Sequence, residues 1–271
     1  MGIVNVTPDS FSDGGKFLPS KAAIAHGRRL IEEGANLLDI GGESTRPGAP
    51  AVSLQEEMDR VLPVLEALVG DGIPISIDTQ KAQLMTAAIR AGASMINDVN
   101  ALLVAGAVEA CTEANVAVCL MHRLGTPATM QRAPVYKDVV KDVVDFLAAR
   151  ASACLNAGIV KDRIVIDPGF GFGKTVEHNF RLLRELDALV VLGFPLLTGF
   201  SRKASLGIVT GRAADERLAA SIAAAILCAQ NGATILRVHD VRETVDAIKV
   251  LMAAKPTIAE KFTNSAKRKN Q

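Results

Sequence analysis

Short apolar runs recur along the chain, and amphipathic stretches of helical length separate them. The runs are rich in Val, Ile and Leu, and turns marked by Gly or Pro precede them. Near-continuous apolar runs are typical of parallel strands that are buried on both faces. We therefore predict eight strands, over residues 2–7, 36–42, 74–79, 95–100, 117–122, 164–169, 195–201 and 235–240.

Eight strands that alternate with helices favour a (β/α)8 TIM barrel, an α/β fold, over an open doubly wound sheet. Nearly every run carries a polar residue at its C-terminal end, and this decides between the two folds. In a barrel these ends converge on one mouth, whereas in an open sheet they would lie along an edge. The residues are Asn5, Asp39, Asp78, Asn97, His122, Asp167, Ser201, Arg237 and His239.

Composition limits the classes of protein that remain. Hydrophobic residues make up 49% of the 271 residues, enough for the core of one large domain. We expect a single barrel over 1–254 and a frayed basic tail over 255–271. The net charge of +1 gives no reason to expect nucleic acid or an anionic membrane as a partner.

The four cysteines lack CxxC spacing and predict reduced core thiols. The chain also has no uninterrupted apolar run near the length of a membrane span, and no charged segment typical of a signal peptide. Together these features predict a soluble, cytoplasmic protein.

Asp78, Asn97 and Asp167 end the third, fourth and sixth predicted strands. Buried carboxylates are costly unless a partner satisfies them, so two in one mouth indicate a ligand or a cation. Carboxylates accept hydrogen bonds and an amide both accepts and donates, which suits the edge of an amino-pyrimidinone ring. The alternative is that each side chain merely caps the following helix.

Arg237 and His239 lie two residues apart on the last predicted strand, so their side chains share one face. An Arg in an apolar strand is costly unless it reaches an anion or the mouth. With Arg46 in the second loop, the pair suggests an anion clamp. The alternative is that Arg237 pairs with a core Asp. His122 is interpreted as a structural, hydrogen-bonded histidine.

The segment DPGFGFGKT ends like a phosphate-binding P-loop, but Pro168 stands where that motif needs Gly. The segment is better interpreted as a flexible wall that brings backbone close to a ligand, with aromatic stacking faces. Its glycines are Gly169, Gly171 and Gly173, and its aromatic residues are Phe170 and Phe172. Ser201 and Lys203 lie just beyond the seventh strand, where Lys203 could donate to a ring carbonyl or stabilise developing negative charge. The alternative is that Lys203 is a solvated surface lysine.

Seven motifs in order resemble bacterial dihydropteroate synthases: NVTPDSFSDGG, DIGGESTRPGA, SIDT, INDV, DPGFGFGKT, GFSRKAS and LRVHD. The resemblance runs from residue 2 to about residue 252. It implies a (β/α)8 barrel, a homodimer, a need for Mg²⁺, and inhibition by sulfonamides. The implied reaction condenses 6-hydroxymethyl-7,8-dihydropterin pyrophosphate with p-aminobenzoate and releases pyrophosphate.

The resemblance also implies residue roles. Asp78, Asp167 and Lys203 would be catalytic, and with Asn97 they would bind the pterin. Pyrophosphate would bind Asn5, Thr45, Arg46, Arg237 and His239, and Mg²⁺ would bind Asn5 and Asp13. The p-aminobenzoate pocket would consist of Phe11, Pro47, Phe172, Ser201 and Lys203.

Two other functions remain open at this point: a methyltransferase that uses methyltetrahydrofolate, and a non-catalytic pterin-binding protein. The first would not need the anion clamp, and the second would tolerate its loss. Two departures from the family pattern are expected to matter. Residues that usually precede NVTPDSF are absent, which would affect stability, and Phe200 would alter the fit of sulfonamides.

Overall fold

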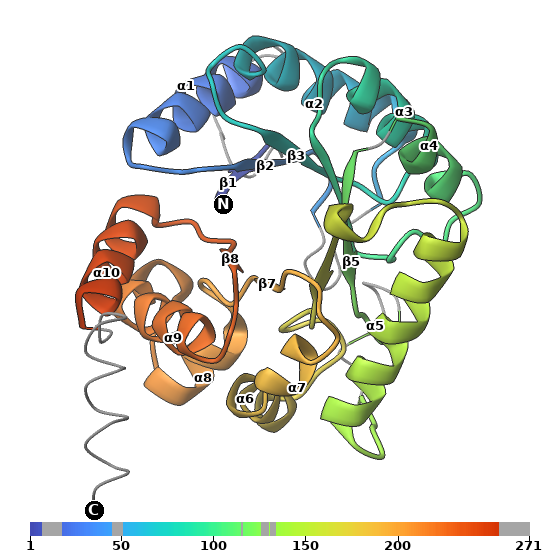
Figure 1. Cartoon of the computed structure of the whole chain (residues 1–271). Helices are drawn as coiled ribbons and strands as arrows, with labels where there is room; N and C mark the ends of the chain where they lie inside the picture. The colour runs from blue at the N-terminus through green and yellow to red at the C-terminus, as the bar shows by residue number, and fades with distance from the viewer. Residues whose placement is uncertain (7–17, 45–50, 115, 126–129, 131–133, 255–271) are drawn as a thin grey trace, which may run out of the picture.

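A computed structural model of the chain describes residues 1–6, 18–44, 51–114, 116–125, 130 and 134–254. Within these residues, parallel strands form a ring and helices cover its outside (Figure 1). The predicted α/β barrel is therefore confirmed. The expected C-terminal tail, residues 255–271, lies outside the described residues.

The strands follow the order of the sequence around the ring. Six form one parallel sheet in the order β1-β2-β3-β4-β5-β6, and β7 pairs with β8 in a second parallel sheet. Single parallel bridges, Gly2 to Val238 and Ile166 to Leu196, connect the two sheets at both seams. The strands are β1 (Gly2–Asn5), β2 (Leu38–Gly41), β3 (Ile75–Asp78), β4 (Met95–Asp98), β5 (Ala117–Met121), β6 (Ile164–Asp167), β7 (Leu197–Thr198) and β8 (Ile235–Leu236).

This strand order excludes the doubly wound sheet, in which the chain would reverse direction from a central strand. Every strand begins and ends within one of the eight predicted runs, but β7 and β8 have only two residues each. The backbone at both seams still pairs, because Ile3 N donates to Val238 O at 3.1 Å and Ile166 N donates to Pro195 O at 3.0 Å.

The helices between the strands begin where the polar loops end. Ser53 caps α2, since its Oγ accepts from Glu56 N at 3.2 Å, as the sequence pattern predicts. The helices are α1 (Leu18–Glu32), α2 (Leu54–Leu68), α3 (Ala82–Arg90), α4 (Ala107–Ala114), α5 (Val139–Asn156), α6 (Val176–Arg184), α7 (Asp187–Val190), α8 (Ala204–Thr210), α9 (Leu218–Gln230) and α10 (Val241–Ala254), with short 3-10 turns at Lys161–Arg163 and Ala214–Glu216.

Alternation along each strand divides the core into two layers. The outer layer lies between strands and helices and includes Ile40, Ile77 and Ile96, all fully buried. The inner layer fills the lower barrel with Met95, Cys119, Val165 and Leu197. The side chains on the inner side therefore change from apolar to polar towards the C-terminal ends of the strands, where Asp78, Asn97 and Asp167 lie.

Cys111, Cys119, Cys154 and Cys228 are unpaired and buried, as predicted for core thiols. Within the part of the chain that the structure describes, no helix is both long and apolar enough to cross a membrane.

Candidate active site

The strand register places polar side chains at one level of the barrel. Asn5 pairs with Gly41, Gly41 with Asp78, and Asp78 with Asn97 across three neighbouring strands. Because Gly41 has no side chain, space remains next to Asp78, whose Cβ lies 3.5 Å from where a Gly41 Cβ would be. Asn5, Asp78 and Asn97, predicted from separate strand ends, thus share one row of the mouth.

Arg237 joins this row from the segment after β8, which pairs with β1 at the seam. Its Nε donates to Asp39 Oδ2 at 2.6 Å, and its Nη2 donates to Asp78 Oδ2 at 2.9 Å. Asn97 Nδ2 also donates to Asp39 Oδ2, at 3.1 Å. Asp39 is therefore the centre of a polar network that connects β2, β3, β4 and the segment after β8.

The network shows that Arg237 is more than a residue of an anion clamp. Its side chain is only 20% exposed and pairs with two carboxylates. The alternative that it pairs with a core Asp is confirmed. Burial alone would lower the pKa of Arg237, and Asp39 and Asp78 raise it above its ordinary value.

The two predicted carboxyl groups of the pterin site both resist ionisation. Burial raises the pKa of Asp78 to about 7, against the opposing effect of Arg237 and with further increases from the Asp39, Asp98 and Glu57 carboxylates. Burial also raises the pKa of Asp167 to about 6, and the Gly169 N–H, Lys203, Lys174 and Arg237 oppose this effect. Each group would be stabilised as a carboxylate by a ligand that donates N–H groups.

Asp167 begins the turn that forms one wall of the mouth. Its Oδ1 accepts from Gly169 N at 2.7 Å. Further along the turn, the Phe172 ring lies 4.1 Å from Lys203 Nζ, measured to the ring centroid. The turn therefore connects three predicted site residues, Asp167, Phe172 and Lys203.

Two interpretations of this turn need correction. Phe170 is not a stacking face for a ligand, because it is 1% exposed and packs in the outer core. Gly169 and Gly173 do not bring backbone close to a ligand either. A Cβ on these residues would lie 2.0 Å from His122 O and 2.4 Å from Leu124 O, so both glycines face the backbone of the neighbouring loop.

Phe200 also differs from expectation. Its ring stacks on Phe170 with centroids 4.5 Å apart and planes at 6°, and it contacts Phe180. These rings pack between strands and helices, so Phe200 points away from the mouth and does not shape a sulfonamide site.

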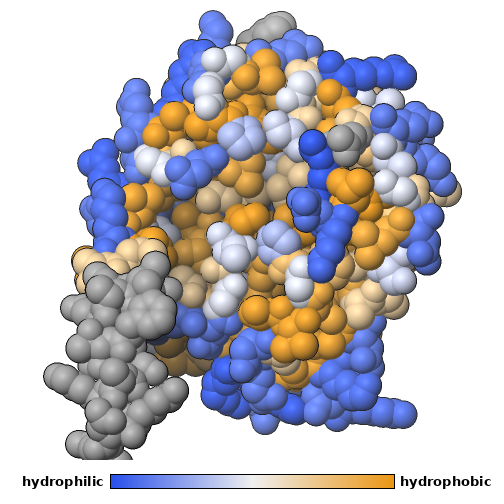
Figure 2. All heavy atoms as spheres, viewed as in Figure 1, coloured by the Kyte–Doolittle hydropathy of each residue, from blue (hydrophilic) through white to orange (hydrophobic). Residues whose placement is uncertain are grey.

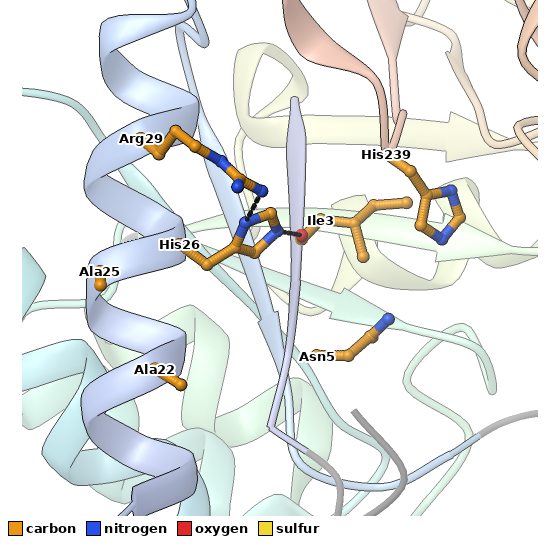
Figure 3. Close-up of a pocket in the computed structure, with 7 residues that line it drawn as sticks. All are labelled: Ile3, Asn5, Ala22, Ala25, His26, Arg29 and His239. Atoms are coloured by element: carbon orange, nitrogen blue, oxygen red, sulfur yellow. Dashed lines mark hydrogen bonds between the residues drawn. The ribbon is translucent and has the colours of Figure 1, made fainter. Parts of the chain in front are cut away.

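A cavity of about 610 Å³ is lined by α1, by β1 and by His239, which follows β8. Figure 3 shows that Asn5 and His239 lie on the same side of β1, and that His26 of α1 reaches the Ile3 carbonyl from the other side. His239 Nδ1 shares a hydrogen bond of 2.9 Å with Ser201 Oγ. The predicted residues Asn5, Ser201 and His239 are thus brought together.

His239 is uncharged at neutral pH in the absence of a ligand. Burial and the neighbouring Arg237 and Arg202 lower its pKa to about 4, while Asp240 opposes them. An anion next to the ring would favour the charged form.

Sequence reasoning missed two buried residues of the mouth. Asp39 was recognised at a strand end but received no role, although a carboxylate within an otherwise apolar buried strand was a usable signal. Lys174 was dismissed with the P-loop pattern, yet it is 3% exposed and contacts His122 Nδ1 at 2.9 Å. This contact confirms His122 as a structural histidine.

Five predicted residues lie outside the described residues: Phe11, Asp13, Thr45, Arg46 and Pro47. Among the residues that are described, no group of three or more His, Cys, Asp or Glu side chains is arranged to hold a metal ion. For Mg²⁺, Asn5 is consequently the one predicted ligand with a described position.

A closed parallel barrel whose mouth carries carboxyl and amide groups from β3, β4 and β6 defines a class of enzyme. The family model of pterin binding enzymes matches residues 1–239. The chain therefore belongs to the pterin-binding enzyme family.

Relatives in this family specify the reaction. The chain is 52% identical over 257 residues to dihydropteroate synthase of Neisseria meningitidis serogroup B, covering 92% of this chain and 90% of that protein. Two structures of Xanthomonas albilineans dihydropteroate synthase, one with 4-aminobenzoic acid and one with 7,8-dihydropteroate, superpose with TM-scores of 0.90 and 0.87. The first is 55% identical to this chain and the second 53%. Each match covers 94% of this chain, together with 93% of the first structure's chain and 94% of the second's.

The chain thus has the activity of a dihydropteroate synthase, a transferase of folate biosynthesis. It condenses 6-hydroxymethyl-7,8-dihydropterin pyrophosphate with p-aminobenzoate and forms 7,8-dihydropteroate and pyrophosphate. This finding decides against the methyltransferase and the non-catalytic pterin-binding protein.

Proposed function

We propose that Asp78, Asn97, Asp167 and Lys203 bind the pterin ring during this condensation. The observation that carries the proposal is the placement of two largely buried carboxyl groups, each with a raised pKa, at the ends of β3 and β6 in one mouth. A pterin edge donates N–H groups, so it would satisfy carboxylates that are otherwise costly to bury. Lys203 would donate to the ring carbonyl.

Pyrophosphate would bind at the cavity beside β1, through Asn5, His239, Thr45, Arg46 and Arg237. Asn5 and His239 line this cavity. Arg237 uses Nε and Nη2 to hold the two carboxylates, and it would contact the anion through Nη1. The same guanidinium would therefore hold Asp78 in place and neutralise charge on the leaving group.

Mg²⁺ fits the donors at this end of the cavity. Asn5 offers an amide oxygen, and hard oxygen ligands together with substrate phosphates are what Mg²⁺ prefers. Asn5 and Asp13 would hold the ion. When bound, Mg²⁺ neutralises the charge that develops on pyrophosphate.

The p-aminobenzoate pocket would be formed by Phe172, Ser201 and Lys203, with Phe11 and Pro47 from the two loops outside the described residues. Phe172 and Lys203 already lie against each other, so a flat ring could stack next to Phe172 while Lys203 remains close to the reacting carbon. The Xanthomonas albilineans structure with 4-aminobenzoic acid supports this proposal. Sulfonamides would compete for the same pocket.

Two sets of residues would stabilise the two charges that form in the reaction, one on the pterin ring and one on the leaving group. Loss of pyrophosphate leaves a methylene cation delocalised over the pterin, and the catalytic carboxylates Asp78 and Asp167 would stabilise it. Arg237 and His239 would stabilise the departing anion. The aniline nitrogen of p-aminobenzoate is a neutral nucleophile, so the mouth needs no strong base.

We further propose a cytoplasmic homodimer. Exposed apolar side chains support a contact between copies: Val191 is 85% exposed after α7, and Ile208 and Val209 on α8 are 69% and 62% exposed. Figure 2 shows hydrophobic side chains gathered on the lower part of one face, where Figure 1 places α7. Sedimentation of the purified chain with and without Ile208→Glu would test this interface.

Release of pyrophosphate tests the proposed roles. The purified chain is incubated with both substrates and Mg²⁺, and the control omits p-aminobenzoate. We expect release that requires all three components and that falls at least tenfold in Lys203→Met. Release without p-aminobenzoate would contradict the condensation, and full activity of Lys203→Met would contradict its catalytic role.

A further inference from the structure

Lys174 occupies an unusual position for a lysine. It lies directly before α6, and its side chain is 3% exposed, although lysines are rarely fully buried. The ammonium has no carboxylate among its four hydrogen-bond partners. Nζ donates to Gly169 O at 3.0 Å, Phe172 O at 3.2 Å, His122 O at 3.3 Å and His122 Nδ1 at 2.9 Å.

These contacts bring together two segments from different loops. Gly169 and Phe172 belong to the turn after β6, whereas His122 directly follows β5. The turn lies so close to the other segment that a Cβ on Gly169 would be 2.0 Å from His122 O. Three carbonyl oxygens that point at one place repel each other. The ammonium between them offsets this repulsion, because it donates hydrogen bonds to these oxygens.

The same contacts determine the state of His122. While Lys174 is protonated its ammonium can only donate, so Nδ1 of His122 accepts and the ring is neutral with its proton on Nε2. Burial and the neighbouring Lys174 lower the pKa of His122 to about 3. Burial and Lys203 lower the pKa of Lys174 to about 7, against the effect of the Asp167 carboxylate. Below that pH the pair places a single cation at the base of the turn.

The turn carries Phe172, which lies against Lys203 in the proposed p-aminobenzoate pocket. Two further contacts hold it on its other sides: Gly171 N donates to Asn179 Oδ1 at 2.8 Å, and Tyr136 Oη donates to Gly173 O at 2.7 Å. Neither reaches the carbonyl of Phe172. Lys174 is thus the side chain that fixes the backbone of Phe172 from inside the barrel wall.

We propose that Lys174 is a positioning residue of the p-aminobenzoate pocket, because it holds the Phe172 backbone against the His122 segment and so sets where the Phe172 ring stands. The inference rests on the proposed role of Phe172. It requires no contact between Lys174 and either substrate. Loss of the ammonium should therefore weaken p-aminobenzoate binding more than pterin binding.

The test compares Lys174→Met, which keeps the length of the side chain, with Leu189→Ala in α7. Leu189 is fully buried on the outside of the barrel, so this control destabilises the fold without touching the turn. We expect Lys174→Met to raise the KM for p-aminobenzoate about tenfold or more, and to change the Kd of an unphosphorylated pterin by less than threefold. Leu189→Ala should change neither value by more than twofold.

Lys174→Gln, which keeps two N–H donors, should show an intermediate KM and provides the measurement if Lys174→Met does not fold. A KM within twofold of the parent chain, or equal losses for both ligands, would overturn the proposal. Failure of both variants to fold would also overturn it, because Lys174 would then be a residue of general stability. A separate variant, Phe172→Leu, tests the pocket itself. If it leaves the KM for p-aminobenzoate unchanged while the parent chain is active, the proposed p-aminobenzoate pocket is wrong, and the role of Lys174 is wrong with it.

Discussion

The Arg237 guanidinium donates to the Asp78 carboxylate at 2.9 Å across the inside of the barrel, although 159 residues separate them in the sequence. With Asp39 as second partner, this contact makes Arg237 both a structural residue and a candidate ligand for pyrophosphate.

Arg237→Ala should reduce both stability and turnover. Removing one partner of a buried ion pair typically costs about 3–5 kcal/mol, because the remaining carboxylates are left without compensation. Without Arg237, the pKa of Asp78 should rise further, so the loss should be larger at pH 8 than at pH 5.5, where protonation relieves it. Calorimetric melting at both pH values measures this effect.

Arg212→Ala is a suitable control for Arg237→Ala, because the Arg212 side chain is 63% exposed and pairs with Glu216 at the surface. Its melting temperature should change little at either pH. An unchanged melting temperature of Arg237→Ala would contradict the structural role that the ion pairs imply.

Asp167→Asn should bind the pterin more weakly yet unfold at a higher temperature. We expect binding to weaken by about 1–3 kcal/mol, since the amide cannot accept two N–H groups as the carboxylate does. The folded pKa is about 6, against an ordinary value of 3.8, so ionisation destabilises the native state increasingly as pH rises through that range. Asn removes this cost, and the melting temperature should rise at pH 7.5 but hardly at pH 4.

Asp246→Asn provides the comparison for Asp167→Asn, because the Asp246 side chain is 67% exposed and its ion pair with Lys249 lies at the surface. It should alter neither pterin affinity nor the pH dependence of melting. Unchanged pterin affinity of Asp167→Asn in titration calorimetry would remove Asp167 from the pterin site.

His239 should take up a proton when pyrophosphate binds. The free chain holds this imidazole neutral at pH 6, because burial lowers its pKa to about 4. A bound anion raises that pKa, so part of a proton is taken up on binding. Calorimetry in two buffers of different ionisation enthalpy measures the uptake, and His239→Asn corrects for the protons of pyrophosphate itself. Equal uptake by both proteins would show that the anion binds elsewhere.

Phe200→Leu should lower stability without affecting the p-aminobenzoate pocket. The change removes a stacked contact with Phe170 in the outer core and should cost about 1–3 kcal/mol. The KM for p-aminobenzoate and the affinity for a sulfonamide should stay within twofold of the parent values. Phe172→Leu should have the opposite effects, with a raised KM and little loss of stability. Altered sulfonamide binding by Phe200→Leu would show that Phe200 does shape the sulfonamide site, as expected from the sequence.

Local patterns of the sequence determined the position of every strand and the residues that reach the mouth. Apolar runs predict buried parallel strands because each residue's burial depends on its immediate neighbours along the strand. The polar ends of these runs, such as Asn5 and Asp167, gave most of the described site. The resemblance of seven motifs to one family added the reaction, which the relatives confirm.

The tertiary structure alone decided which polar groups pair and which side of the barrel wall an aromatic ring faces. Arg237 reaches Asp39 and Asp78 only because closure of the ring brings the segment after β8 next to β1, and so close to β2 and β3. No local sequence pattern shows that these residues are neighbours. Phe200 follows a two-residue strand, and its ring turned outwards to Phe170 rather than into the mouth. In the sequence, Lys174 stood only within a pattern that failed as a P-loop, but carbonyl groups from two loops surround it once the loops pack together. These outcomes depend on contacts between distant segments, which burial and electrostatics settle only after the barrel has closed.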